Sequence, residues 1–317
     1  MTEPATYLVT GGTGFLGSAL VTSLLSSGYK VRTLSRNEHS VEKLQKACGN
    51  EPRLSCLLGS VEDRQRLLKA LRGVDYCIHA AAQKIVPLAE YDPVSCIKTN
   101  VQGTINVADA CLEAGVKRAV FISTDKASAP ATLYGASKLC AERAWLGANR
   151  YSAGKATEYT GVRYGNVFAS AGSVLHAWSK QSQIELTDPR CTRFNMHLEE
   201  ACSFVLRTLE HAAPGELRIP KLPTYRIGDL AHAFRLAFGI KDQPKIVGLR
   251  MAEKLHESLI SESESMACRY QDDSEYVLTP GSIHERGGWE YASGQPGRQL
   301  GVEELTRKID AWRTGNA

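Results

Sequence analysis

Proton transfer needs side chains that gain and lose protons readily, and two short runs of this 317-residue chain supply them. Tyr134 and Lys138 stand four residues apart, so on a helix their side chains share one face. An ammonium group beside a phenol stabilises the phenolate and lowers the tyrosine pKa from about 10 toward neutrality. We therefore expect Tyr134 to act as a base toward the hydroxyl of a sugar or an alcohol. The alternative is an exposed helix pair, since this spacing is frequent by chance.

A hydroxyl, an acid and an amine follow one another at Thr124, Asp125 and Lys126, directly after an apolar run that reads as a strand. Oxidation of an alcohol needs only the hydroxyl, Tyr134 and Lys138. The additional acid and amine suit an elimination, because one carbon then loses a proton while a departing hydroxyl gains one. Asp125 and Lys126 therefore predict an elimination. The alternative is a salt-bridged pair in a loop.

A glycine-rich turn lies close to the N-terminus. Gly11, Gly14 and Gly17 have G-x-x-G-x-x-G spacing between an apolar run at 7–10 and a helical pattern at 14–28. In dinucleotide sites the first glycine permits a tight turn, the second lets backbone approach a pyrophosphate, and the third lets the helix pack on the strand. The start of such a helix also supplies free N–H groups for phosphates. This turn therefore predicts a dinucleotide site.

The end of the second expected strand, at 31–34, indicates which dinucleotide binds. An NAD site usually offers a carboxylate there to the ribose 2′-hydroxyl. In this chain the strand is followed by Ser35 and Arg36, and the first acid is Glu38. Ser35 and Arg36 suit a 2′-phosphate, so we expect NADP rather than NAD. Asp63, after the third strand, can be explained as only the start of a helix.

These residues need a scaffold, and the first half of the chain alternates strands with helices. The expected strands are 7–10, 31–34, 54–58, 76–80, 119–122 and 160–167, and the helices between them 14–28, 42–48, 62–72, 94–114 and 134–150. This alternation predicts an α/β fold with a doubly wound parallel sheet, whose ligands bind at the carboxyl ends of the strands. Further helices are expected at 198–212, 228–238 and 302–313. We expect a nucleotide-binding domain at 1–167 and roughly 195–238, and a smaller C-terminal substrate-binding lobe at 168–194 and 239–317.

Composition excludes several classes of protein. A formal net charge of +4 over 317 residues is not the concentrated basic face of a nucleic-acid binder. No apolar run approaches the roughly 18 residues of a membrane span, and the first residues lack the basic start of a signal peptide. The nine cysteines include no C-x-x-C pair. We expect them to be reduced core residues of a cytoplasmic protein, with no disulfide framework and no metal site.

The glycine-rich turn and Tyr134-x-x-x-Lys138 together resemble the extended short-chain dehydrogenase/reductases, which implies a Rossmann sheet. A closer resemblance is to the inverting UDP-N-acetylglucosamine 4,6-dehydratases of the polysaccharide biosynthesis branch. It rests on Ser123-Thr124-Asp125-Lys126-Ala127, Pro130 and Tyr134-Gly135-Ala136-Ser137-Lys138. It covers nearly the whole chain, with further matches at 79–84, 99–101, 162–167, 192–194, 220–223, 248–250 and 253–257. The Asp-Lys pair separates this branch from epimerases and from retaining hexose dehydratases, whose pair is Asp-Glu.

The resemblance implies a reaction sequence on UDP-N-acetylglucosamine with bound NADP. Tyr134 takes the proton from the sugar O4 as hydride leaves C4, Thr124 holds that oxygen, and Lys138 binds the nicotinamide ribose. The 4-ketone acidifies H5, which Lys126 removes while Asp125 protonates the departing O6. Lys126 must be neutral for this step, helped by desolvation and by the Lys138 cation. Hydride returns to C6 and C5 is reprotonated on the opposite face, giving a UDP-4-keto-6-deoxy-L-hexosamine.

The resemblance also implies which residues bind the cofactor and the substrate. The cofactor contacts are expected to be Gly11, Thr13, Gly14, Phe15, Leu16, Gly17, Ser35, Arg36, Ser60, Val61, Ala80, Ala81, Ala82, Lys84, Asn100, Tyr134 and Lys138. The substrate contacts are expected to be Lys84 near the sugar and Asn166, Arg193, Arg250 and Glu253 on the UDP part, the alternative being ordinary contacts between lobes. Two positions depart from the family: Ser60 stands where it has Asp, and Met251-Ala252 where it has Pro-Gly. These departures affect one adenine contact and the identity of the sugar.

Two rival functions remain open. One is a UDP-sugar 4-epimerase or reductase on the same fold, against which Asp125 and Lys126 argue. The other is a non-catalytic NADP-binding protein, against which the intact Thr124, Tyr134 and Lys138 argue. The expected partners are the UDP-sugar and further copies of the chain, in a dimer or a hexamer, with no nucleic acid and no membrane insertion.

Overall fold

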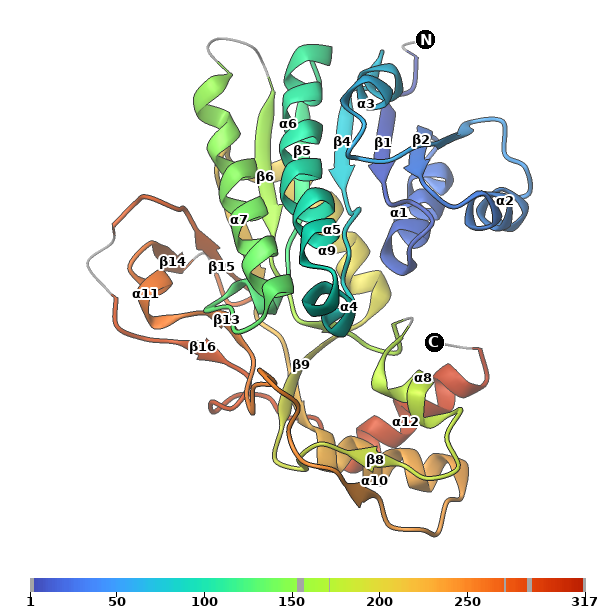
Figure 1. Ribbon diagram of the computed structural model, residues 1–317, viewed down its shortest axis with the longest axis vertical. Coiled ribbons are helices and arrows are strands. Elements are labelled where there is room, and N and C mark those ends of the chain that lie inside the picture. Colours follow the sequence, from blue (N-terminus) through green and yellow to red (C-terminus); the bar gives the residue numbers. More distant parts are fainter. Residues whose placement is uncertain (1–2, 153–156, 171, 271, 284–286, 316–317) are drawn as a thin grey trace.

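A nine-stranded sheet forms the middle of the larger lobe in the computed structural model, which describes residues 3–152, 157–170, 172–270, 272–283 and 287–315 (Figure 1). The strand order is β14-β15-β10-β6-β5-β4-β1-β2-β3. Neighbours from β3 to β10 pair in parallel, and β15 and β14 add antiparallel pairings at the edge. The strands are β1 Thr6–Thr10, β2 Lys30–Ser35, β3 Leu54–Leu58, β4 Tyr76–His79, β5 Arg118–Ile122, β6 Glu158–Val162, β10 Leu217–Pro220, β14 Cys268–Tyr270 and β15 Glu275–Leu278. The predicted doubly wound parallel sheet is confirmed.

Helices cover both faces of this sheet because the central strands are apolar on both sides. Val9 and Ile78 share one core with α1 and α9, whereas Leu8 and Phe121 share the other with α3, α6 and α7. The helices are α1 Phe15–Ser26, α2 Glu38–Ala47, α3 Arg64–Leu71, α6 Gly103–Ala114, α7 Leu133–Gly147 and α9 Leu198–His211. The carboxyl ends of the parallel strands point toward the second lobe (Figure 1).

The expected helix at 94–114 is divided. Two short helices, α4 Val86–Tyr91 and α5 Pro93–Ile97, lead into a π-helical turn, η1 Lys98–Gln102, and only then into α6. Within this turn Asn100 Nδ2 donates to the Gln83 carbonyl oxygen and to Ser137 Oγ, both at 3.0 Å. Local π-helical turns are frequent at functional sites. This one fixes the loop that follows β4 against α7.

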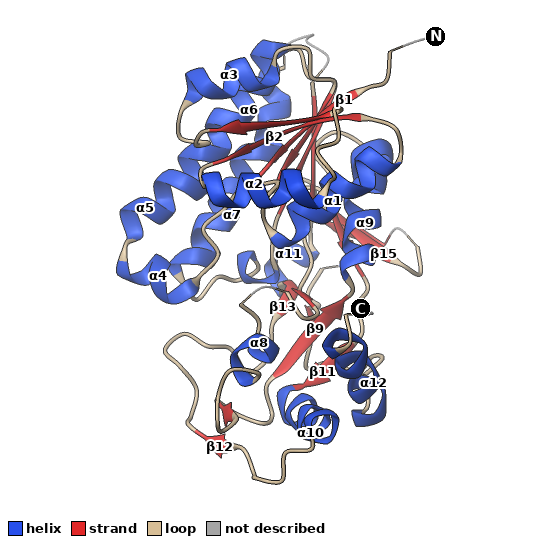
Figure 2. Ribbon diagram, turned by 90° about the vertical axis from the view of Figure 1, so that its right-hand side faces the viewer, coloured by secondary structure: helices blue, strands red, loops and turns tan. Residues whose placement is uncertain are grey.

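The smaller lobe has a separate core. It is built from α8 Val174–Trp178, β8 Glu185–Leu186, α10 Ile227–Phe238, β12 Lys245–Ile246 and α12 Val302–Arg313, and it buries Trp178, Phe234 and Leu305. A sheet of β7 Asn166–Val167, β9 Thr192–Met196 and β11 Thr224–Arg226 lies between the lobes (Figure 2). The pair β13 Ser258–Ile260 and β16 Tyr291–Ala292, with α11 Glu262–Ser265, returns the chain to the larger lobe.

Three elements have partners in the structure that the sequence did not lead us to expect. The strand expected at 160–167 ends at Val162, and 166–167 pairs in another sheet as β7. α10 was expected in the nucleotide-binding domain, but its apolar face packs on α12 through Phe234 and Ile309. β14 and β15 were expected in the substrate lobe, yet they extend the main sheet beside β10. Each difference concerns which partner an element finds, and periodicity does not specify that.

Candidate active site

The candidate catalytic residues lie at the carboxyl end of β5, where the chain forms the turn η2 Asp125–Ala127 before α7. Thr132 caps α7, and its Oγ1 accepts a hydrogen bond from the Gly135 N–H at 3.1 Å. Gly135 has no room for a side chain, because a Cβ there would collide with the Lys126 carbonyl oxygen. This close approach places the first turn of α7, and with it Tyr134, against the catalytic turn.

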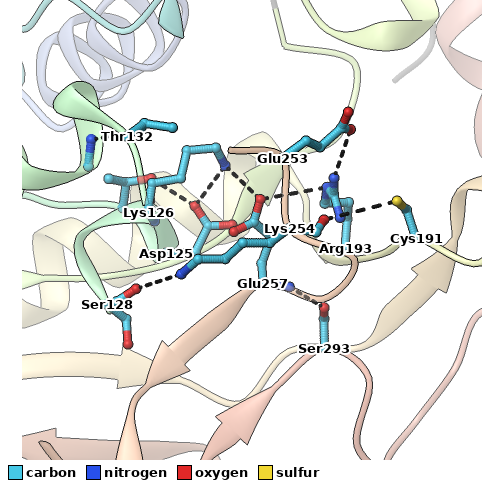
Figure 3. Close-up of polar contacts among 12 residues, drawn as sticks. Asp125, Lys126, Ser128, Thr132, Cys191, Arg193, Glu253, Lys254, Glu257 and Ser293 are labelled. Carbon is cyan, nitrogen blue, oxygen red and sulfur yellow. Dashed lines mark hydrogen bonds and ion pairs between the residues drawn. The ribbon is translucent and has the colours of Figure 1, made fainter. Parts of the chain in front are cut away.

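Three of the predicted catalytic side chains are hydrogen-bonded to one another in this turn. The Thr124 hydroxyl donates to Asp125 Oδ1 at 2.8 Å. Lys126 Nζ donates to the same oxygen at 3.1 Å (Figure 3). Asp125 is buried, and its Oδ2 has no hydrogen-bond partner among the described residues. The structure thus brings a hydroxyl, an acid and an amine together and leaves one buried carboxylate oxygen unpaired.

Tyr134 lies buried beside this cluster. Burial raises the pKa of Tyr134 to about 12, while the Lys126 ammonium group and a hydrogen bond with Thr124 lower it. The sequence led us to expect Lys138 as the cation that acidifies this phenol. In the structure the ammonium group that acts on Tyr134 is Lys126.

Lys138, one turn further along α7, contacts the end of β5. Its Nζ donates to the Ile122 carbonyl oxygen at 2.7 Å and lies 3.9 Å from the centre of the Phe121 ring. Burial lowers the pKa of Lys138 to about 7, although Glu142 raises it. Burial thus disfavours the charged form of Lys138, which makes it a weaker source of positive charge for Tyr134 than expected.

Lys126 lies between two carboxylates that favour its charged form. Burial lowers the pKa of Lys126, but Asp125 and Glu257 raise it more, and the resulting pKa lies above the ordinary lysine value. Its Nζ lies 3.5 Å from Glu257 Oε1 in addition to its hydrogen bond with Asp125. In the site without substrate, two carboxylates outweigh the desolvation and favour the ammonium form of Lys126, whereas the expected elimination step needs the neutral form.

A fully buried arginine fixes the elements behind the turn, and no motif indicated its role. Arg163 follows β6, and its Nη2 lies 2.6 Å from Glu142 on α7 and 2.8 Å from Glu264 on α11. The Ser123 hydroxyl donates to Glu142 at 2.7 Å, and the Ser128 hydroxyl donates to Glu264 at 3.0 Å. Both ends of the catalytic turn are thus bound to carboxylates that Arg163 neutralises. The only sequence signal was a charged residue directly after an apolar strand.

The glycine-rich turn between β1 and α1 has the shape that a pyrophosphate needs. Gly11 has φ +70°, and a Cβ there would lie 2.9 Å from the Ala81 backbone. A Cβ on Gly17 would collide with the Gly11 carbonyl oxygen, so helix and turn touch directly. α1 begins after Gly14 with no side-chain cap and no acid in its first turn. Its first N–H groups are therefore free of a cap, and the residues present fit a dinucleotide.

The other predicted cofactor residues follow β1, β2, β3 and β4 at the same edge of the sheet. The hydroxyls of Thr13 and Ser35 are hydrogen-bonded at 3.0 Å, and Arg36 is exposed next to them. Asn100 Oδ1 accepts a hydrogen bond from the Gln83 N–H at 2.8 Å. The remaining members of this set are Phe15, Leu16, Ser60, Val61, Ala80, Ala81, Ala82 and Lys84.

Two further charged residues, Asp63 and Lys84, follow β3 and β4. Asp63 is the N-cap of α3, where its Oδ1 accepts a hydrogen bond from the Arg66 N–H at 2.9 Å. The helix-start interpretation of Asp63 is therefore confirmed. Burial lowers the pKa of Lys84 in the loop after β4.

All four residues expected on the UDP part line one cavity of about 260 Å³: Asn166, Arg193, Arg250 and Glu253. Arg193 Nη2 lies 3.2 Å from Glu253 Oε1, and Glu253 Oε2 accepts a hydrogen bond from the Arg250 N–H at 3.1 Å. Two arginines with one carboxylate suit a diphosphate and a neighbouring hydroxyl or amide. The fold brings these residues together from distant segments.

Tyr225 of β11 lines the same cavity and was not in the predicted set. Burial raises the pKa of Tyr225 to about 12, and the charges of Arg193 and Lys126 lower it. Tyr225 is thus influenced by one cation of the cavity, Arg193, and by one cation of the catalytic turn, Lys126. A single tyrosine in a three-residue strand gives no sequence signal.

Other kinds of site find no support in the part of the chain that the structure describes. Within those residues no group of three or more His, Cys, Asp or Glu side chains could hold a metal ion. The nine cysteines are free thiols. None of the described helices has both the length and the apolar character that crossing a membrane requires.

Known proteins resemble this chain over most of its length. The polysaccharide biosynthesis protein family matches residues 7–278. A UDP-N-acetylglucosamine 4,6-dehydratase (inverting) of Campylobacter jejuni is 42% identical over 281 residues, which are 86% of this chain and 82% of that protein. A UDP-glucose 4-epimerase of Rickettsia canadensis is 36% identical over 284 residues, 87% of this chain and 82% of that protein. The crystal structure of Pen from Bacillus thuringiensis is 30% identical, covers 97% of both chains and has a TM-score of 0.90.

Replacing Arg163 with methionine should destabilise the fold, because Glu142 and Glu264 then share a buried site without this cation. We expect the free energy of unfolding to fall by about 3–5 kcal/mol at pH 8, measured by urea denaturation. Burial raises the pKa of Glu264 but Arg163 lowers it to about 2, so the carboxylate is ionised in the native protein. In the variant the pKa of Glu264 rises because its burial is no longer offset by Arg163, so protonation of Glu264 relieves the loss as the pH falls. A loss of unfolding free energy that is the same at pH 5 and pH 8, or smaller than about 1 kcal/mol, would contradict this role of Arg163.

Proposed function

The chain belongs to the polysaccharide biosynthesis protein family, and from this membership we propose that it converts UDP-N-acetylglucosamine to a UDP-4-keto-6-deoxy-L-hexosamine by 4,6-dehydration with inversion at C5. The observation that carries the proposal is the Asp125–Lys126 pair, hydrogen-bonded at 3.1 Å beside the buried Tyr134. Loss of water needs one group that removes a proton and another that delivers one, and this pair supplies both. The name of the Campylobacter relative supports the same reaction.

The glycine-rich turn binds a nicotinamide dinucleotide, which we propose is NADP. The N–H groups at the start of α1 would hold its pyrophosphate, and Ser35 and Arg36 its 2′-phosphate. Such a cofactor would supply hydride transfer at the sugar C4 and C6. The support for NADP over NAD is the absence of a carboxylate between the end of β2 and Glu38.

Tyr134 is the base for the oxidation at C4. It accepts the O4 proton, and the Thr124 hydroxyl contacts the same oxygen. Because the pKa of Tyr134 is about 12 in the structure, the phenolate needs a nearby positive charge when it forms. The Lys126 ammonium group supplies that charge, so Lys126 assists the oxidation before it serves the elimination.

The elimination needs a protonated Asp125 and a neutral Lys126, whereas the two side chains form an ion pair in the structure. One proton shift produces both, since Lys126 Nζ already donates to Asp125 Oδ1 at 3.1 Å. The Lys126 amine then takes H5, the C5–H electron pair forms the C5–C6 double bond, and O6 leaves as water with the Asp125 proton. Afterwards Lys126 is again an ammonium group and Asp125 a carboxylate. The pair thus ends with the charges it began with.

We place the UDP group in the cavity that Asn166, Arg193, Arg250 and Glu253 line. The two guanidinium groups would bind the diphosphate oxygens, and Glu253 would accept a hydrogen bond from the ribose or the uracil. The ion pair between Arg193 and Glu253 at 3.2 Å must then share Arg193 with the diphosphate. Lys84, in the loop after β4, is placed toward the sugar and the nicotinamide.

A UDP-sugar 4-epimerase is the second candidate, because the Rickettsia relative is named a UDP-glucose 4-epimerase. Epimerisation, or reduction of a 4-ketone, uses Thr124 and Tyr134 but needs neither an acid at Asp125 nor an amine base at Lys126. Mass spectrometry of purified protein with UDP-N-acetylglucosamine and NADP distinguishes the functions. A product lighter by one water supports the dehydratase. A C4 epimer of unchanged mass would replace it, and no conversion would favour a non-catalytic NADP-binding protein.

Two further proposals concern the setting of the enzyme. We propose that it works in the cytoplasm, and the nine free cysteines support a reducing compartment. We also propose a homo-oligomer, a dimer or a hexamer. Its support is a row of exposed apolar side chains along α4 and α5: Ile85, Leu88, Tyr91, Val94 and Ile97. Light scattering of the purified protein measures this directly.

Replacing Arg36 with alanine should weaken NADP binding by about 1–3 kcal/mol, because a charged hydrogen bond to the 2′-phosphate is lost. NAD binding should change little, so the preference for NADP narrows. Isothermal titration with both nucleotides measures this. Arg64→Ala is the matched control, since Arg64 is a surface arginine on α3 that pairs with Glu113. Equal affinity of the native protein for NADP and NAD would overturn the assignment.

Replacing Lys126 with alanine should separate the two half-reactions. Oxidation at C4 still has Tyr134, although it loses the ammonium group that favours the phenolate, whereas the elimination loses its base. We expect the absorbance of the reduced cofactor to appear slowly and persist, without a dehydrated product. Tyr134→Phe should block even the first absorbance change. Turnover of Lys126→Ala at the native rate would show that another group removes H5.

A further inference from the structure

A second carboxylate reaches Lys126 from the other side of the site. Glu257 Oε1 lies 3.5 Å from Lys126 Nζ, and the Glu257 side chain is only 6% exposed. Figure 3 shows Lys126 between Asp125 and Glu257, with Arg193 beyond Glu257. Lys126 is therefore bound by two acids, and the proposed mechanism uses only one of them.

The backbone holds Glu257 firmly in this position. The Glu257 N–H donates to Ser293 Oγ at 2.9 Å, and the Ser293 N–H donates to the Glu257 carbonyl oxygen at 2.8 Å. The Ser293 hydroxyl is also hydrogen-bonded to Thr192 Oγ1 at 2.7 Å. These contacts fix Glu257 to the segment after β16 and to β9, the strand that also carries Arg193.

Glu257 also lies beside a second cation. Arg193 Nε lies 3.8 Å from the same oxygen, Oε1, that faces Lys126. The charged or titratable groups that act on Lys126 are Asp125 beside it, Glu257, Tyr134 on α7 and Tyr225 on β11. Of these, Glu257 is the carboxylate that the proton shift within the Asp125–Lys126 pair leaves unchanged.

We propose that Glu257 is a positioning residue that makes Lys126 a stronger base. When Lys126 takes H5 it becomes an ammonium group, and the Glu257 carboxylate stabilises the positive charge as it forms. The same contact keeps Nζ next to Asp125, where the proton shift occurs. This inference rests on the proposed function, since it assigns Glu257 a part in the elimination.

The contact with Arg193 extends the same role to the substrate. If the diphosphate binds Arg193, the ion pairs of its guanidinium group with Glu253 and Glu257 weaken. Glu257 then pairs mainly with Lys126. Binding of the UDP part would then increase the basicity of Lys126 at the moment it is needed. Two contacts carry this effect. Arg193 Nε lies 3.8 Å from Glu257 Oε1, and Lys126 Nζ lies 3.5 Å from the same oxygen.

The first test needs no substrate and measures how readily Lys126 becomes neutral. Competitive reductive methylation, read by peptide mass spectrometry, reports the reactivity of Lys126 relative to the other lysines. Removing a carboxylate within 4 Å should lower the pKa of Lys126 by about one unit or more, so in Glu257→Gln its reactivity should rise about tenfold. Glu257→Asp should keep most of the native reactivity. Glu253→Gln is the matched control, because Glu253 pairs with Arg193 at 3.2 Å and has no ion pair with Lys126.

The second test follows the half-reactions with UDP-N-acetylglucosamine and NADP. Glu257→Gln should form the reduced cofactor, accumulate it and release dehydrated product at least tenfold more slowly, with a larger isotope effect when C5 carries deuterium. Glu257→Asp should restore part of this rate, and Glu253→Gln should change mainly KM. For Glu257→Gln we therefore expect two results together: faster methylation of Lys126 and slower elimination. Unchanged methylation of Lys126, or equal slowing of both half-reactions, would show that Glu257 is only structural.

These two tests also separate failure of the inference from failure of the proposed function. If the native protein forms no dehydrated product, the proposed function and the role in elimination are both wrong. The methylation result still decides whether Glu257 controls the charge of Lys126. If the native protein dehydrates the sugar and Glu257→Gln behaves like the native protein in both tests, only the inference is wrong.

Discussion

The buried ion pairs of Arg163 with Glu142 and Glu264 are the interaction on which the catalytic site depends. Charges buried this completely are costly unless each is paired, so the three side chains must be present together. Through Ser123 and Ser128 the two carboxylates bind both ends of the turn that carries Thr124, Asp125 and Lys126. The same Glu142 lies on α7 one turn after Lys138. The network therefore fixes the catalytic turn, α7 and α11 as one unit.

The segment that we propose binds the substrate is attached to this unit through Lys254. Lys254 Nζ donates to the carbonyl oxygens of Ser128 at 3.0 Å and of Ala129 at 2.6 Å. Its neighbours in sequence are Glu253, which pairs with Arg193, and Glu257, which pairs with Lys126. A short stretch of chain thus contacts the end of the catalytic turn, the cavity assigned to UDP and the proposed base. This explains how occupation of a diphosphate site could influence a lysine on a different lobe.

The local features of the site followed from the sequence, whereas its charge states did not. Three local features depend on residues close together in the chain, and the structure contains each of them. They are the glycine-rich turn at 11, 14 and 17, the helix start at Asp63, and the helix that carries Tyr134 and Lys138. The protonation of Lys126 depends on Glu257, which lies far away in the sequence and reaches Lys126 only through the fold. The role of Arg163 and the packing of α10 on α12 likewise need pairings that periodicity does not contain. Residue types indicated candidate groups for the chemistry, and tertiary contacts determine which charges lie beside those groups.

The central claim is that Lys126 removes the C5 proton and that a different donor returns one to the opposite face of the ring. Incubation of the purified protein with UDP-N-acetylglucosamine and NADP in deuterated water, followed by NMR of the fresh product, tests it directly. The account predicts a 4-keto-6-deoxy sugar with deuterium at C5 and the L-arabino configuration. A D-xylo product, or a dehydrated product that keeps its original hydrogen at C5, would contradict it.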